Sequence, residues 1–263
     1  YEQPDALGNT INGRLGEHDV LDNIFGLGSS DAFKNVKRIQ FVACGTSLHA
    51  AKTARKWFED ICEIPCYIDF ASEYRYRNPI VEDHTLFVTI SQSGETADTL
   101  AALEYARAEK YVGIVTICNV PTSTMARNAD WKIFTNAGPE IGVASTKAFT
   151  TQLAALLMLA LSIAKSQDKN AKKRKQATQE LRETPALVDQ AFSLKENISQ
   201  ITQNISTKHN ALFLGRGMYF SIAQEGALKL KEISYIHAEA YPAGELKHGP
   251  LALVDEQIPV IAL

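Results

Sequence analysis

The sequence predicts an α/β protein in which a parallel sheet is covered by helices on both faces. Short apolar runs alternate with helical patterns along most of the chain, which is typical of parallel strands joined by right-handed helical crossovers. Two turns rich in hydroxyl side chains directly follow predicted strands. Apolar residues make up 45% of the 263 residues, enough for one large domain or two smaller ones.

The elements follow in order. Residues 1–35 are expected to lead into the first domain, with a short helix that starts at Pro4 and a loop near Gly26. Short runs rich in β-branched and aromatic residues predict the strands 38–43, 66–70, 86–90, 112–117 and 131–135. The patterns between and after them predict the helices 48–62, 97–109 and 148–164.

The second part of the chain repeats this order. Residues 168–207 predict two amphipathic helices, and residues 211–214 then form a strand that ends at Gly215-Arg216-Gly217, before a helix over 221–235. The same strand, glycine turn and helix occur at residues 41–50, so an internal duplication is expected. We expect a first domain over 36–195 and a second over 196–263, whose last strand begins near Ile258. The chain lacks an initial Met, so we expect a fragment with an incomplete second domain.

Composition excludes several classes of function. A net charge of −3 gives no electrostatic case for nucleic acid, and the apolar stretch 154–164 is too short to span a membrane. No signal peptide is recognised. The spacing of the four cysteines does not fit a metal site, so we expect reduced thiols in a cytoplasmic protein with no metal. The four are Cys44, Cys62, Cys66 and Cys118.

The turn Ser91-Gln92-Ser93-Gly94-Glu95-Thr96 is the first candidate site. It joins a strand to a helix, and a helix N-terminus favours an anion through its N–H groups and dipole. Thr46-Ser47 follows another strand, and Ser145-Thr146 precedes a third helix. Each turn alone is equally well explained as a helix cap. Because the carboxyl ends of parallel strands share one edge, the first two turns together predict a phosphate site, which we call the hydroxyl cradle (residues 44–47 and 91–96).

Glu225, Lys229 and Glu232 form the second candidate, the charged row. Their spacing of four and three places them on one helix face. A surface row of ion pairs explains this spacing too. However, apolar neighbours, including Ile233, predict that much of the helix is buried, and a carboxylate beside an ammonium in a cleft can act as a general base.

Residues 237–250 form the third candidate. Their glycines and prolines predict a loop, and loops often carry function. His248 is a candidate acid or base there, although a lone histidine in a loop is usually just exposed. Other catalytic patterns fail: residues 90–94 lack the first glycine of a nucleophile elbow, and Phe220 stands where a dinucleotide fingerprint needs glycine.

Four segments together resemble one family. Residues 44–47, 91–99, 140–147 and 225–250 are similar to the sugar-isomerase (SIS) half of the glucosamine-6-phosphate synthase family, the glutamine:fructose-6-phosphate aminotransferases. The resemblance implies two tandem SIS domains, the second incomplete here, that assemble as a homodimer. It implies conversion of fructose 6-phosphate and ammonia to glucosamine 6-phosphate, with ammonia from an N-terminal glutaminase domain, and no cofactor.

The resemblance also implies roles for single residues. The phosphate is held by Ser47, Ser91, Gln92, Ser93 and Thr96, and the sugar is lined by Cys44, Gly45, Thr46, Val143 and Ser145. His248 assists ring opening from across the dimer interface, Glu232 moves a proton between C1 and C2, and Lys229 assists with charge. The family's Schiff-base lysine lies beyond residue 263, so we expect weak substrate binding and no complete amination by this chain.

Two other readings stay open. Another SIS protein, either a ketose/aldose phosphate isomerase or a non-catalytic sugar-phosphate sensor, shares the serine turns. A sensor needs neither Glu232 nor His248, so their joint presence favours the enzyme. The third class is a structural or interaction protein, and this class gives the two hydroxyl-rich turns no function.

Overall fold

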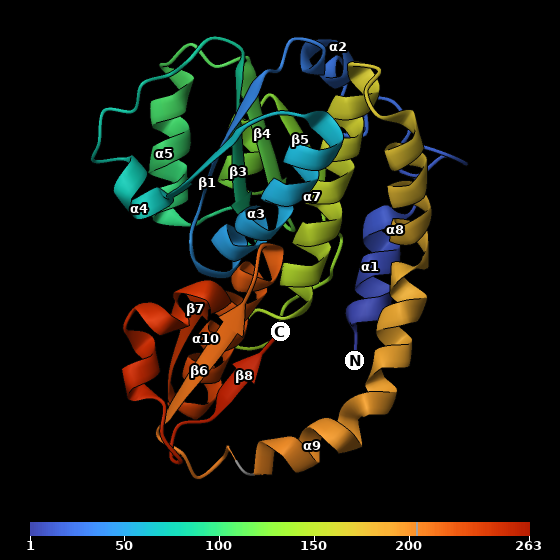
Figure 1. Ribbon diagram of the computed structural model, residues 1–263. Helices are drawn as coiled ribbons and strands as arrows, with labels where there is room; N and C mark the ends of the chain where they lie inside the picture. The colour runs from blue at the N-terminus through green and yellow to red at the C-terminus, as the bar shows by residue number, and fades with distance from the viewer. Residues whose placement is uncertain (204) are drawn as a thin grey trace. The chain divides into compact units, whose positions relative to one another are not determined.

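The computed structural model describes residues 1–203 and 205–263, which form two compact units (Figure 1). The larger unit contains Glu2–Glu140 and Thr146–Ala186. The smaller unit contains Tyr1, Ile141–Ser145 and Leu187–Leu263. Each is described separately.

A parallel sheet forms the centre of the larger unit. Its five strands lie in the order β2-β1-β3-β4-β5, and every neighbouring pair is parallel. All residues of β3 are buried, as expected for a central strand covered on both faces. The strands are β1 (Arg38–Ala43), β2 (Cys66–Phe70), β3 (Thr85–Ser91), β4 (Gly113–Cys118) and β5 (Trp131–Phe134).

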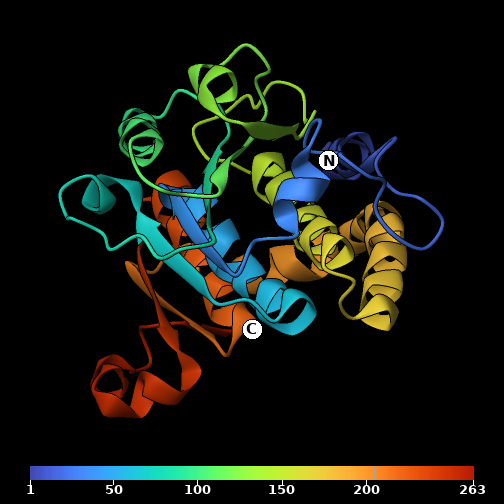
Figure 2. The same cartoon turned by 90° about the horizontal axis from the view of Figure 1, so that it is seen from above.

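Helices cover both faces of this sheet, as the alternation predicts (Figures 1 and 2). On one face, Val42 and Phe87 pack with side chains of α4, α5 and α6. On the other face, Phe41 packs against Phe58, and α3 packs against α7. The elements are α3 (Gly45–Trp57), the π-helical turn η1 (Phe58–Cys62), α4 (Ala71–Tyr74), α5 (Ala97–Arg107), α6 (Thr124–Asn128) and α7 (Lys147–Ser166).

The prediction that the apolar stretch near residues 154–164 is too short to cross a bilayer is wrong on length and composition: helix α7 has 20 residues and a mean hydropathy of 1.5 over its most apolar stretch. However, 78% of that stretch is buried inside the protein, and α7 packs against α1 (Gln3–Ile11), α2 (Ser29–Phe33) and α3. We therefore interpret α7 as a core helix of the sheet.

Residues 2–35 belong to the larger unit, because both of their helices pack on α7. The division between the units falls inside α8 (Ala171–Ala191), directly after Pro185 and Ala186. A proline within a helix removes a backbone hydrogen bond and favours a bend. The predicted domain boundaries at residues 35 and 195 remain predictions.

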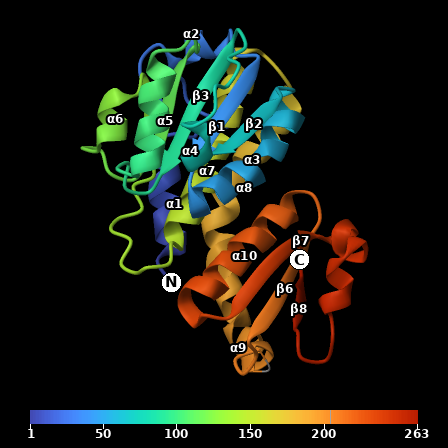
Figure 3. The ribbon, with the colours of Figure 1, turned by 90° about the vertical axis from the view of Figure 1, so that its left-hand side faces the viewer.

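A second parallel sheet, in the order β7-β6-β8, lies in the smaller unit, with α10 packed along β6 and β7 (Figure 3). Its connections repeat those of the first sheet: β6 is central, and the next two strands in sequence pair on either side of it, as β2 and β3 do around β1. This supports the expected duplication. The elements are η2 (Phe192–Leu194), α9 (Lys195–Gln203), β6 (Asn210–Gly215), α10 (Met218–Ser234), β7 (His237–Pro242), η3 (Ala243–His248), η4 (Pro250–Leu253) and β8 (Val260–Ala262).

The prediction of a loop over residues 237–250 is wrong for its first six residues, which form strand β7 beside β6. Ala238 is fully buried and alternates with the more exposed His237 and Glu239, a strand pattern obscured by the glycines and prolines that follow. Pro242 ends the strand, where a missing N–H is tolerated. The expected burial of Ile233 is also wrong, since it is 67% exposed at the end of α10.

Candidate functional site

The two turns of the hydroxyl cradle lie at the topological switch point of the larger sheet. The chain leaves β1 to form β2 on one side, and β3 then pairs on the other side of β1. Ala43, the last residue of β1, is paired with Ile90 near the end of β3, so the turns that follow both strands emerge at the same edge. As the sequence predicted, they are neighbours, and a switch point is where open parallel sheets bind ligands.

The turn after β3 is held by its own hydroxyl groups. Thr96 occupies the N-cap position of α5 but makes no capping bond, because its Oγ1 lies 2.9 Å from Ser91 Oγ. Ser91 Oγ also accepts the Gly94 N–H at 3.0 Å, and Ser93 Oγ accepts the Glu95 N–H at 3.1 Å. The simple interpretation as a helix cap therefore does not describe Thr96 or Ser93. The N-cap side chain thus makes no cap to the first turn of α5, and a helix N-terminus of this kind can receive an anion.

The turn after β1 has the same character. Cys44 is the N-cap residue of α3 and makes no side-chain cap, while Ser47 is 8% exposed in the first helical turn. Gly45 has a positive φ of 50°, and a Cβ there would meet no atom within 4 Å. Cys44 Sγ lies 3.8 Å from Oγ1 of the buried Thr99, in the first turn of α5. The starts of α3 and α5 are thus brought together.

The cradle offers neutral donors and contains no lysine or arginine. Its one charged residue, Glu95, accepts the backbone N–H of Thr124 with Oε1 at 2.6 Å. This bond, with a contribution from the charge of Arg127, holds the pKa of the Glu95 carboxyl below its usual range. Donors without charge are suited to binding a phosphate monoester reversibly.

Two of the predicted sugar-lining residues belong to the other compact unit. Val143 is 93% exposed, and Ser145 is half-buried, in the segment Ile141–Ser145. Thr146, the next residue, is the N-cap of α7 and makes no side-chain cap. The roles of Val143 and Ser145 stay predictions.

The charged row is a network of ion pairs with one buried end. Lys229 Nζ lies 2.6 Å from Glu232 Oε2 and 3.4 Å from Glu225 Oε1. Glu225 is only 5% exposed, and the side chains of Lys229 and Glu232 are 22% and 29% exposed. A fully solvated surface row is therefore excluded. An ammonium beside a partly accessible carboxylate can stabilise negative charge while that carboxylate transfers a proton.

His248 is exposed at the end of η3, and Gly249 follows with a φ of 136°. The structure places it in the same compact unit as the charged row. Its predicted role in ring opening is not tested by this placement.

Burial affects several cysteine thiols in the part of the chain that the structure describes. The four cysteines are free, and burial raises the pKa of the Cys62 thiol to about 12 and raises that of Cys118. These two thiols stay protonated and unreactive near neutral pH. Within residues 1–203 and 205–263, no group of three or more metal-ligating side chains is assembled.

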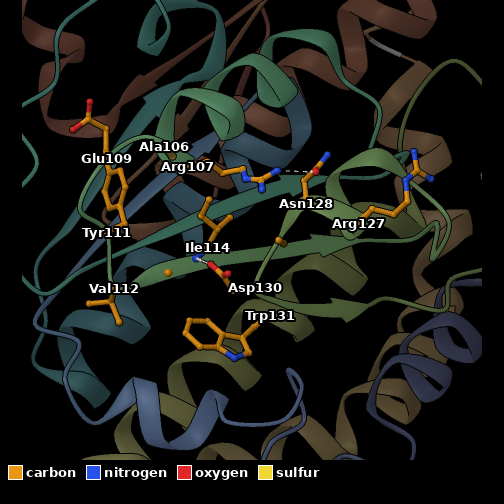
Figure 4. A pocket seen from close by; sticks show the side chains of 12 residues that line it. Ala106, Arg107, Glu109, Tyr111, Val112, Ile114, Arg127, Asn128, Asp130 and Trp131 are labelled. Atoms are coloured by element: carbon orange, nitrogen blue, oxygen red, sulfur yellow. Dashed lines mark hydrogen bonds between the residues drawn. The ribbon is translucent and has the colours of Figure 1, made fainter.

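The structure also contains a pocket of about 520 Å³ that the sequence did not indicate (Figure 4). It lies at the amino ends of β4 and β5, whereas the cradle lies at the carboxyl ends of β1 and β3. Arg107 donates to Asn128 Oδ1 at 2.9 Å, and Asp130 Oδ2 accepts the Ile114 N–H at 2.8 Å. Scattered polar residues at helix ends look like ordinary solvated surface in a sequence, so no pattern marked this pocket.

Known proteins match this chain over its whole length. A relative in Idiomarina loihiensis, named glutamine–fructose-6-phosphate aminotransferase (isomerizing), is 54% identical over this whole chain. A protein of the same name in Pseudomonas aeruginosa is 53% identical. The chain spans about 43% of the length of these curated relatives.

Solved structures show the same fold. The C-terminal domain of glucosamine-fructose-6-phosphate aminotransferase from Francisella tularensis matches all of this chain, which covers 74% of that one, with a TM-score of 0.96 and 52% identity. Tagatose-6-phosphate ketose/aldose isomerase from Escherichia coli matches 99% of the chain, which covers 70% of it, with a TM-score of 0.75 and 19% identity, and shows the fold alone.

The family model for the SIS domain matches residues 32–162 and 204–263, which include both turns of the hydroxyl cradle and the whole charged row. The two matched segments correspond to the two parallel sheets. The chain therefore belongs to the SIS domain family.

Proposed function

We propose that this chain is the isomerase part of a glutamine:fructose-6-phosphate aminotransferase, and that its hydroxyl cradle binds the phosphate of fructose 6-phosphate. The observation that carries the proposal is the convergence of two helix N-termini without side-chain caps, α3 and α5, at the switch point between β1 and β3. The names of relatives at 54% and 53% identity support the choice of substrate.

The predicted binding residues divide between the two ends of the substrate. Ser47, Ser91, Gln92, Ser93 and Thr96 hold the phosphate, through hydroxyl groups and the N–H groups of the first helical turns. Cys44, Gly45, Thr46, Val143 and Ser145 line the sugar. The open space around Gly45 supports this assignment, because a ligand can approach the backbone there without meeting a side chain.

The chemistry proceeds through an imine in this proposal. His248 assists opening of the sugar ring, and the C2 carbonyl condenses with ammonia, with loss of water. Glu232 takes a proton from C1 and returns it to C2, while the imine nitrogen gains a proton and the C1 hydroxyl loses one, which leaves an aldehyde at C1 and an amino group at C2. Lys229 Nζ lies 2.6 Å from Glu232 Oε2, and its positive charge stabilises the negative charge that develops on the substrate as C1 loses its proton.

The proposal includes the assembly. Ammonia comes from an N-terminal glutaminase domain in the whole protein, and the fact that the chain spans 43% of its relatives supports such a longer protein. We propose a homodimer in which His248 acts across the interface. Its exposure supports this, since an exposed side chain is free to meet a partner. Four free cysteines fit the reducing conditions of the cytoplasm.

The alternative is another SIS sugar-phosphate isomerase or a non-catalytic sensor of sugar phosphates. Either would use the same cradle. The charged row favours the enzyme over the sensor, because a sensor needs no carboxylate such as Glu232 to transfer a proton.

Calorimetric titration with fructose 6-phosphate tests the cradle. Replacing Ser93 and Thr96 together by alanine is expected to weaken binding at least about 100-fold, since each hydrogen bond to a charged group contributes roughly 1.5–3 kcal/mol. The matched control removes two exposed hydroxyls that donate to backbone carbonyls elsewhere, Ser193→Ala with Thr202→Ala, and should bind as the unmodified chain does. Equal affinity of the cradle variant and the unmodified chain would contradict the proposal.

A further inference from the structure

Glu95 is an unexpected residue in a turn that binds an anion, because its carboxylate would repel a phosphate. In the structure, the carboxylate of Glu95 is instead bound to a neighbouring segment of the chain. Glu95 Oε1 accepts the backbone N–H of Thr124, which follows the neighbouring strand β4, at 2.6 Å. Two main-chain bonds join the same segments: Asn119 N–H to Gln92 O at 3.0 Å and Met125 N–H to Gly94 O at 3.1 Å.

The segment that holds Glu95 is itself fixed. Asn119 Oδ1 accepts bonds from Thr135 Oγ1 at 3.1 Å and from the Ala137 N–H at 2.8 Å. Ser123 Oγ accepts the Ala126 N–H at 3.3 Å and so caps α6, in contrast to Thr96 at α5. The turn after β4 is therefore held by its own hydrogen bonds, and Glu95 joins the cradle to it through a charged group.

We propose that Glu95 is a positioning residue of the hydroxyl cradle: by binding the Thr124 N–H, it fixes residues 92–96 in the conformation that receives the phosphate and turns its own charge away from the ligand. Glu95 does not touch the substrate. This inference rests on the proposed function, since it concerns the same phosphate site. Preorganisation of this kind raises affinity because the bound conformation need not be ordered at the moment of binding.

The test compares Glu95→Ala and Glu95→Gln in the full 263-residue chain by calorimetry with fructose 6-phosphate. Alanine removes the acceptor and should raise the Kd about tenfold, by allowing residues 92–96 more conformations. Glutamine keeps an oxygen at the same position and should change the Kd less than about threefold, because a neutral amide oxygen still accepts an N–H.

Asp130→Ala is the matched control. Asp130 also accepts a backbone N–H, that of Ile114 at 2.8 Å, but at the amino ends of the strands. Both alanine variants should lower the thermal midpoint by similar amounts, whereas only Glu95→Ala should weaken binding. Amide hydrogen exchange at Thr124 and Gly94 should speed up in Glu95→Ala and not in Asp130→Ala.

The outcomes separate the two claims. Binding by the unmodified chain with no loss in Glu95→Ala, or an equal loss in Asp130→Ala, would overturn the role of Glu95 and leave the phosphate site intact. A glutamine variant as weak as the alanine variant would overturn it too, since the acceptor would then not be what matters. No binding by the unmodified chain would overturn the proposed function and this inference with it.

Discussion

Replacing Glu232 by glutamine is expected to lower kcat for glucosamine 6-phosphate formation about a thousandfold, the typical contribution of a general base. The assay uses the longer protein that includes the C-terminal lysine implied by the family resemblance, with ammonia as the amino donor. Glutamine can still accept a bond from Lys229, so the fold of α10 should persist. The KM for fructose 6-phosphate should change little, because Glu232 does not belong to the hydroxyl cradle.

Lys231→Gln provides the control on the same helix. Lys231 is exposed in the last turns of α10, and its replacement changes the charge without touching the ion pairs of Lys229. Its kcat should stay within about twofold of the unmodified enzyme, as expected for a surface substitution. A Glu232→Gln enzyme of normal kcat would show that the charged row has only a structural role.

The second large effect is expected for Gly94→Ala, which should lower the free energy of unfolding by about 3 kcal/mol. Gly94 has a φ of 66°, which disfavours any side chain, and a Cβ there would lie 2.5 Å from Ser123 Cβ and still closer to its Oγ. The turn would have to move away from its support, so binding of fructose 6-phosphate should be lost as well. Thermal unfolding followed by circular dichroism and calorimetric titration measure the two effects.

Gly28→Ala separates backbone strain from steric conflict. Gly28 also has a positive φ, of 79°, but no atom lies within 4 Å of a Cβ built there. It should cost only about 1 kcal/mol, the usual penalty for a side chain in the left-handed region, and leave binding unchanged. If Gly94→Ala were no more harmful than Gly28→Ala, the close contact between the cradle and Ser123 would not hold the turn in place.

The sequence predicted the larger sheet and the common edge of its two hydroxyl-rich turns, because the signals are local. Apolar runs such as residues 86–90 define strands, and a hydroxyl-rich turn after a parallel strand must emerge at the carboxyl edge. The adjacency of the turns at residues 44–47 and 91–96 follows from strand order, which pattern alone suggests but does not determine.

Other features depend on contacts between distant residues, and a single sequence does not show these. The role of Glu95 depends on where the turn after β4 places the Thr124 N–H, and the pocket near Trp131 depends on how helix ends meet strand ends. Strand β7 was missed because its single buried residue, Ala238, gives a weak hydrophobic signal beside conspicuous glycines and prolines. The apolar neighbours of Glu225 suggest that it is buried, but its exposed fraction of 5% follows only from the three-dimensional structure.

The most direct test of the central claim is to map the ligand by NMR, titrating the ¹⁵N-labelled chain with fructose 6-phosphate. If the uncapped starts of α3 and α5 bind the phosphate, the largest shifts should fall on the amides of Gly45–Ser47 and Ala97–Thr99. The amides of Gly113, Asp130 and Trp131, which line the pocket at the opposite ends of the strands, should stay unchanged. Shifts confined to those pocket residues, with none at the two helix N-termini, would contradict the account.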